Sequence, residues 1–217
     1  MSITFGYFHF YPDMIIHIWP EFLKAFVAIF LNIMLFRAGR AEKGNNKQKI
    51  LVSLSIINIV FIVLPFATPS VIGTTLPTPN EITILRFYSL FSDILRTIPF
   101  FITYGIMMYL YGKRNRDKLS KYYTVSAWVL LLCNGFFVIS ITFPVFSVFT
   151  FPQFVFYELY SVLTIIFLLV YFVGWVFFAL HGKIVDSVNF MYAGILGCSL
   201  VVLNIVFFIN KGMYIPF

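Results

Sequence analysis

The chain has 217 residues, of which 61% are hydrophobic, 21% aromatic and only 11% charged, and its mean hydropathy is +0.95. Soluble domains carry about 25% charged residues, so this composition excludes a water-soluble domain. The net charge of +7 would favour nucleic-acid binding in a soluble protein, but in a membrane protein its placement indicates topology. We therefore expect an all-α integral membrane protein with one transmembrane domain, residues 1–217, in contact with the lipid bilayer and with no nucleic acid.

Six apolar segments are long enough to cross about 30 Å of hydrocarbon, which takes roughly 20 residues of helix. They cover approximately residues 13–36, 50–72, 82–111, 123–146, 154–180 and 190–210. The N-terminus lacks the basic region of a signal peptide, so the first segment is expected to insert as a helix. The order of segments and connections predicts a six-helix bundle built as three helical hairpins.

Lysine and arginine gather in alternate connections. Residues 37–49 and 113–121 hold five basic residues each, and the third connection of this kind holds Lys183. No lysine or arginine occurs in residues 1–12, 73–81 and 147–153. Basic residues concentrate in cytoplasmic loops, so we expect loops 37–49 and 113–121 in the cytoplasm, both termini outside, and contacts of these loops with anionic lipids.

Six charged residues lie within the outer halves of the predicted spans. They are Glu21, Lys24, Arg86, Asp93, Arg96 and Glu158. An ionised side chain at the bilayer centre costs about 2.5–3.5 kcal/mol on insertion scales, and such residues usually face the bundle interior or a wet cavity. Residues three apart share a helix face, so Asp93 can pair with Arg96, and Glu21 with Lys24 in the same way. We expect the six to line a substrate or ion pathway; the alternative is a dry ion-pair network that fixes helix register.

Asparagine recurs inside the predicted spans, at Asn32, Asn58, Asn134 and Asn204. Amide hydrogen bonds between membrane helices contribute about 0.6–2 kcal/mol each, and we expect these four to serve in helix packing. Three of them begin an Asn-x-x-Phe pattern in the second helix of each predicted hairpin, which suggests a threefold repeat. The uneven spacing from the preceding acidic residue leaves that repeat open.

The last predicted span carries small residues on one face, namely Ala193, Gly194 and Gly197. Small side chains allow helix backbones to approach closely. This face is therefore expected to pack tightly, either within the chain or against a partner in a homo-oligomer or membrane complex.

Signs of catalysis are absent from the sequence. It contains no HExxH or GxSxG motif and no phosphate-binding glycine loop, and Cys133 and Cys198 both fall inside predicted spans. We expect no catalytic residue, metal or cofactor, and an enzyme is disfavoured. Two functions remain: a small channel- or transporter-like protein with a polar outer vestibule, or a non-catalytic subunit or assembly factor of a larger membrane complex.

Overall fold

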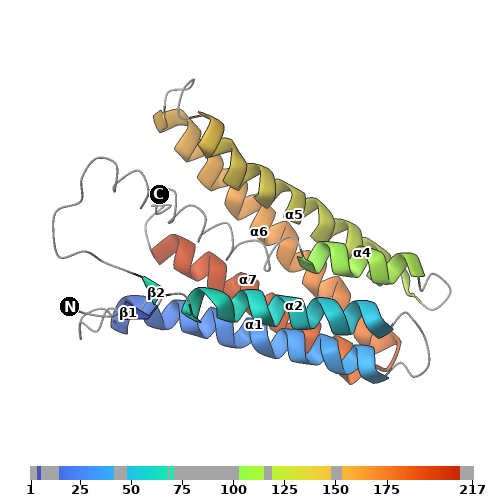
Figure 1. Cartoon of the computed structure of the whole chain (residues 1–217). Coiled ribbons are helices and arrows are strands. Elements are labelled where there is room, and N and C mark those ends of the chain that lie inside the picture. Colours follow the sequence, from blue (N-terminus) through green and yellow to red (C-terminus); the bar gives the residue numbers. More distant parts are fainter. Residues whose placement is uncertain are drawn as a thin grey trace.

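The computed structural model describes residues 4–5, 15–41, 48–67, 69–70, 103–114, 119–147 and 153–210. Side chains are described within residues 22–41, 49–63, 103–113, 119–137 and 162–206. These parts of the chain are helical, apart from a two-residue antiparallel pairing of β1 (Thr4–Phe5) with β2 (Pro69–Ser70). The helices are α1 (Ile15–Ala41), α2 (Gln48–Ala67), α4 (Tyr104–Arg114), α5 (Lys121–Ser147), α6 (Gln153–Ile184) and α7 (Val188–Asn210) (Figure 1).

Within the residues whose side chains are described, three helices contain a segment long and apolar enough to cross a membrane. The segments are Phe22–Ala41 in α1, Val162–Ile184 in α6 and Val188–Val206 in α7. Helix α2 contributes a shorter apolar stretch, Lys49–Val63. The expectation of a helical membrane protein is met by these elements, while the full count of six spans stays a prediction.

The helix limits agree with the predicted spans except at the ends of α1 and α2. The prediction of a helix up to residue 72 is wrong: α2 ends at Ala67, and Pro69–Ser70 pair with β1, since proline has no N–H to donate to a helix. Helix α1 extends beyond the predicted limit at residue 36, so that it includes Arg37 and also Arg40, which lies in its last turn. The Arg40 guanidinium lies 5.8 Å from the centre of the Phe36 ring. The attraction between a cation and the face of an aromatic ring stabilises this contact. The apolar part of the α1 sequence therefore ends before the helix does. Of the predicted span 82–111, the structure describes residues 103–111, which open α4.

Each helix buries residues three and four positions apart, as a helix with one packed face must. On α1 the side chains of Ala28, Leu31 and Leu35 are fully buried. The opposite face carries large apolar side chains such as Phe26, which is 59% exposed. An apolar outer face fits a helix surrounded by hydrocarbon, because lipid does not penalise exposed apolar side chains.

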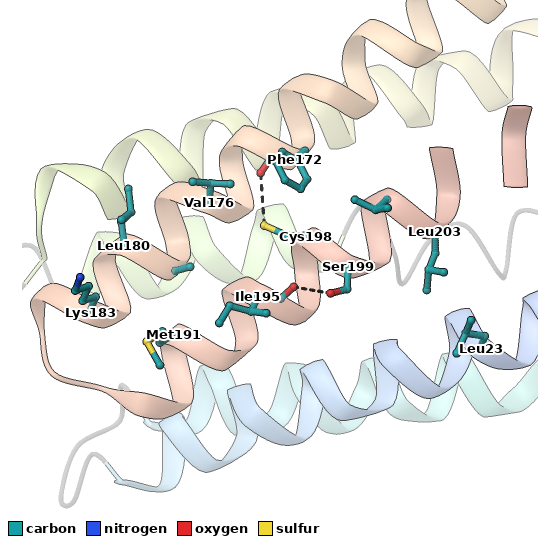
Figure 2. Close-up of a pocket in the computed structure, with 12 residues that line it drawn as sticks. Leu23, Phe172, Val176, Leu180, Lys183, Met191, Ile195, Cys198, Ser199 and Leu203 are labelled. Carbon is teal, nitrogen blue, oxygen red and sulfur yellow. Dashed lines mark hydrogen bonds between the residues drawn. The ribbon is translucent and has the colours of Figure 1, made fainter. Parts of the chain in front are cut away.

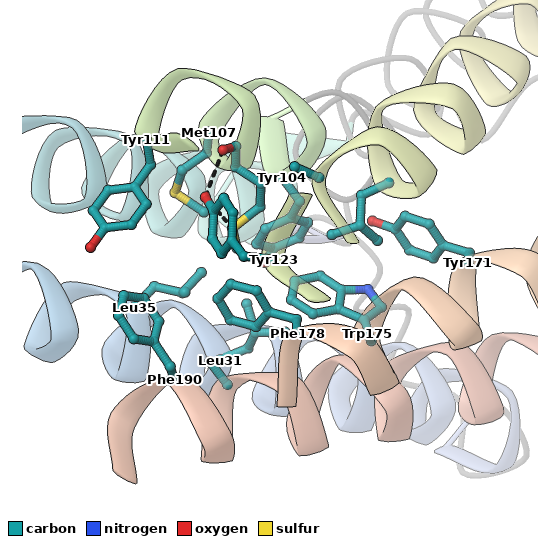
Figure 3. Packing of buried hydrophobic residues seen from close by; sticks show 14 of the residues in the cluster. Leu31, Leu35, Tyr104, Met107, Tyr111, Tyr123, Tyr171, Trp175, Phe178 and Phe190 are labelled. Carbon is teal, nitrogen blue, oxygen red and sulfur yellow. Dashed lines mark hydrogen bonds between the residues drawn. The ribbon is translucent and has the colours of Figure 1, made fainter. Parts of the chain in front are cut away.

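Aromatic side chains form the centre of the bundle, where α4, α5, α6 and α7 meet (Figure 3). Tyr104 lies edge-on to Trp175 with ring centres 5.4 Å apart, and Trp175 lies edge-on to Phe178 at 5.7 Å. Phe178 meets Phe190 of α7 in the same way at 5.5 Å. Edge-to-face pairs of this kind add about 0.5–1.5 kcal/mol each beyond their burial. This cluster fixes the position of α4 against α6 and α7.

The C-terminal ends of α1, α4 and α6 lie at the same end of the bundle as the N-terminal ends of α2, α5 and α7 (Figure 1). Two contacts support this arrangement: Tyr111 at the end of α4 lies 5.8 Å from Phe190 at the start of α7, and Ser120 bonds to His181. Exposed cationic side chains gather at this end, namely Arg37, Arg40, Lys49, Lys113, Lys121 and Lys183. Among the described side chains, Asp186 is the acidic one. We call this the cationic end.

Candidate functional site

Three buried asparagines lie at matching positions along their helices. Asn32 is halfway along the apolar segment Phe22–Ala41, and Asn58 and Asn134 are at the midpoints of α2 and α5. Asn32 and Asn58 are fully buried, and Asn134 is 3% exposed. The three amides are therefore among the buried polar groups of the bundle interior.

Asn32, Asn58 and Tyr104 are connected by hydrogen bonds. The Nδ2 of Asn32 donates to the Tyr104 hydroxyl at 2.6 Å and to the Ala28 carbonyl at 2.8 Å. The Nδ2 of Asn58 donates to the Oδ1 of Asn32 at 3.1 Å. Three helices, α1, α2 and α4, are thus joined by side-chain bonds. We call Asn32, Asn58 and Tyr104 the amide network.

Asn134 differs from the amide network, because neither its Nδ2 nor its Oδ1 has a hydrogen-bond partner. It lies against Gly105 of α4: a Cβ at position 105 would come 2.1 Å from the Asn134 Nδ2. Glycine at 105 therefore makes the room that the amide occupies. Tyr104 and Gly105 are adjacent, so the first turn of α4 contacts both the amide network and Asn134.

Unpartnered amide groups inside a membrane protein need an explanation. Burying a polar group without a hydrogen bond costs about 1–3 kcal/mol in measured proteins, and no lipid tail can supply the bond. The Oδ1 of Asn58 and the hydroxyl of Ser55, three residues earlier on α2, are also buried and unpartnered. These groups offer neutral donors and acceptors to water, an ion or a polar solute.

Further unpartnered hydroxyls occur on the two helices that follow α4. They belong to Ser126 of α5 and Thr164 of α6, and both are buried. None of these groups is an acid, a base or a strong nucleophile at ordinary pH. Within the described side chains, no three His, Cys, Asp or Glu residues come together as metal ligands. What these hydroxyl and amide groups can do is donate and accept hydrogen bonds.

The predicted charged pathway falls mainly beyond what the structure describes. Lys24 lies partly buried on α1. Glu21 and Glu158 belong to α1 and α6, but their side chains lie outside the described residues. Arg86, Asp93 and Arg96 lie outside them altogether. The clustering of these six charges stays a prediction.

Asn204 is unlike the other asparagines. Its Nδ2 donates to the Leu200 carbonyl one turn earlier on its own helix, at 2.9 Å, and its side chain is partly buried. Asn58, Asn134 and Asn204, which share the Asn-x-x-Phe pattern, thus have three different environments. The pattern does not correspond to three equivalent sites.

The small-residue face of α7 packs within the chain. Ala193, Gly194 and Gly197 are buried. A Cβ at Gly194 would lie 2.5 Å from the Ala179 backbone nitrogen, and one at Gly197 would lie 2.2 Å from the Trp175 ring. Both neighbours belong to α6. This face was expected to pack either within the chain or against a partner. In the structure it allows α6 and α7 of the same chain to approach closely.

A second polar contact lies at the cationic end and has no counterpart in the sequence-based reasoning. His181 is 1% exposed, and its Nδ1 is 2.9 Å from the Ser120 hydroxyl. The Tyr123 ring packs against the imidazole at 4.9 Å, and the Tyr123 hydroxyl donates to the Met108 carbonyl at 2.6 Å. These contacts hold the start of α5 against α4 and α6.

Comparison of the chain with protein-family models, curated proteins and solved structures finds no match.

Proposed function

We propose that the protein is a small channel- or transporter-like membrane protein whose polar pathway passes Asn134. One observation carries this proposal: Asn134 is buried at the midpoint of α5 with both amide atoms unpartnered. An amide that served helix packing alone would find a partner on a neighbouring helix, as Asn32 and Asn58 do. A polar solute or ion that binds transiently would satisfy the free hydrogen-bond donor and acceptor of Asn134.

The proposed topology has six spans in three hairpins, with both termini outside and loops 37–49 and 113–121 in the cytoplasm. The exposed cations of the cationic end support this orientation, because basic residues are retained on the cytoplasmic side. In this orientation the opposite end of the bundle is the outer one. Glu21, Lys24, Arg86, Asp93, Arg96 and Glu158 would form the outer vestibule that leads toward the amides.

The proposed mechanism is replacement of hydration by amide groups. A polar solute or ion that leaves water must regain the hydrogen bonds or coordination it loses. Asn134 supplies one neutral donor group and one acceptor, and Asn58 supplies an acceptor. Neutral groups bind less tightly than charges, which favours release as well as entry. The first turn of α4 lies beside both amide sites.

A non-catalytic subunit or assembly factor is the second candidate. The amide network favours it, because bonds that join α1, α2 and α4 make a rigid bundle without any ligand. In that case the charged residues near the outer end would form a dry ion-pair network that fixes the positions of the helices. The two candidates differ in one respect: a subunit needs no polar species at Asn134.

Flux through reconstituted protein separates the two. Purified protein in phosphatidylcholine liposomes is tested for uptake of glycerol and urea by light scattering, and for K⁺ and Cl⁻ by fluorescent indicators. We expect at least one of these species to cross faster than in protein-free liposomes. Asn134→Leu should reduce that flux at least tenfold, because it removes both hydrogen-bonding atoms.

Asn204→Leu is the matched control, since it makes the same substitution at an amide bonded within its own helix. It should keep the wild-type flux. If folded wild-type protein passes none of the four species, or if Asn134→Leu passes them unchanged, the channel or transporter proposal is wrong and the subunit is favoured.

A further inference from the structure

An apolar groove runs along the outside of the bundle between α6 and α7 and encloses about 660 Å³ (Figure 2). Its walls are the facing side chains of these two helices, with Leu23 of α1 added at one end. The lining includes Phe172, Val176, Ala179, Ile195, Ser199 and Leu203. The volume falls within the range of about 300–1,000 Å³ that is usual for small-molecule sites.

The polar atoms within the groove are already bonded to their own protein. The Ser199 hydroxyl donates to the Ile195 carbonyl at 3.0 Å, and the Cys198 thiol donates to the Phe172 carbonyl at 3.9 Å (Figure 2). The groove therefore presents a hydrocarbon-like surface to any occupant. A polar ligand would gain no hydrogen bond there, whereas an alkyl chain would gain packing contacts.

Lys183 lies at one end of the groove, and Leu23 and Leu203 lie toward the other (Figure 2). Lys183 is exposed and belongs to the cationic end. Among the described residues it has no ion pair, although Asp186 follows in the next turn. An unpaired ammonium at the end of an apolar groove is complementary to an amphiphile with an anionic head.

The length of the groove matches one leaflet of a bilayer. Phe172 and Lys183 are eleven positions apart on α6, which corresponds to about 16 Å at 1.5 Å per residue. Half of the hydrocarbon core is about 15 Å. A lipid whose head lies at the Lys183 end would thus extend its chain over the whole groove.

We infer that this groove binds one acyl chain of an anionic phospholipid, with the lipid phosphate at the Lys183 ammonium. Basic pockets between membrane helices are used to bind anionic head groups, and this groove adds a matching site for the chain. The site is distinct from the basic loops 37–49 and 113–121. It depends on the exposed face of α6 and α7 and not on any flux through the bundle.

Lipid retention in native mass spectrometry tests the inference. The protein is purified in detergent with equal amounts of dioleoylphosphatidylglycerol and dioleoylphosphatidylcholine, and the bound lipid is counted. We expect one phosphatidylglycerol to be retained in preference to phosphatidylcholine. Lys183→Gln should lower that preference about fivefold, which corresponds to the ~1 kcal/mol that one lysine contributes near an anionic membrane surface. Lys113→Gln removes an exposed lysine of the separate basic loop 113–121, away from the groove. It weakens only the contacts of that loop with lipid and should leave this one retained phosphatidylglycerol bound.

A second pair of variants tests the chain site. Ser199→Phe fills the groove and should abolish retention of the lipid, whereas Val173→Phe, on an exposed position of α6 outside the groove, should leave it unchanged. Equal loss of phosphatidylglycerol in Lys183→Gln and Lys113→Gln would overturn the inference, as would retention in folded Ser199→Phe. A shift from dimer to monomer in Ser199→Phe without loss of lipid would also overturn it and assign the groove to a second copy of the chain.

Discussion

Asn32 and Asn134 are the same residue type and both are buried, Asn32 halfway along the apolar segment Phe22–Ala41 and Asn134 at the middle of α5, yet they have opposite hydrogen-bonding states. Asn32 donates to Tyr104 and Ala28 and accepts from Asn58. Asn134 has no partner for either amide atom. The comparison teaches that an amide inside a membrane bundle has two uses, which its partners distinguish: a bonded amide holds helices together, and an unbonded one is open to a polar species.

The largest effect is expected from removing the bonded amide. Asn32→Leu breaks the bonds to Tyr104 and Asn58 at once and leaves their polar atoms buried. We expect the free energy of unfolding to fall by about 2–4 kcal/mol, from two interhelical bonds and the stranded groups. Denaturant titration in detergent measures this. Asn204→Leu, which removes a bond within one helix, should cost far less, and equal losses would contradict the role of the amide network.

A smaller effect is expected where Asn134 meets α4. In Gly105→Ala the added methyl would collide with the Asn134 amide, and it would also lie 2.9 Å from the Leu131 Cα. Because backbone as well as side chain is in the way, α4 must move, and we expect a loss of about 1–3 kcal/mol. Gly135→Ala is the control, since nothing lies within 4 Å of its new Cβ. Equal losses of thermal stability in Gly105→Ala and Gly135→Ala would show that α4 is not packed on α5 at this point.

The smallest change in stability is expected at Asn134 itself. Asn134→Leu removes two unpartnered polar atoms and puts a side chain of similar shape in their place. Such a replacement is neutral or stabilising by up to about 2 kcal/mol, in contrast to Asn32→Leu. Denaturant titration in detergent measures the free energy of unfolding of Asn134→Leu for comparison with that of Asn32→Leu. A loss as large as that of Asn32→Leu would mean that Asn134 is bonded in the folded protein.

Much of the architecture could be predicted from hydropathy. The apolar segments predict α1, α2, α5, α6 and α7, because an uninterrupted apolar run must be helical in lipid. The end of α2 was predicted wrongly, since hydropathy continues through Pro69 and Ser70, where the helix has already ended. The basic connections were likewise visible as charge runs. Hydropathy could not show that α1 continues past Arg37, since that depends on backbone hydrogen bonds and on the long side chains of cations.

The candidate site was predicted less completely. The asparagines stand out in apolar sequence, but their spacing does not tell Asn32 from Asn134. Their difference arises from Tyr104 and Gly105, which come from another helix: the first provides a hydroxyl and the second a gap. The Ser120–His181 bond and the groove beside Lys183 depend in the same way on which helices become neighbours. Composition and periodicity contain no information on that choice.

The central claim, that Asn134 faces a polar pathway, is tested most directly by the accessibility of a cysteine at that position. Asn134→Cys is made in a background with Cys133→Ala and Cys198→Ala, and membranes are treated with a small membrane-impermeant thiol reagent. Ala127→Cys, buried on the same helix two turns earlier, is the matched control. The account predicts labelling at position 134 and none at 127. Folded protein that stays unlabelled at 134 from both sides of the membrane would contradict it.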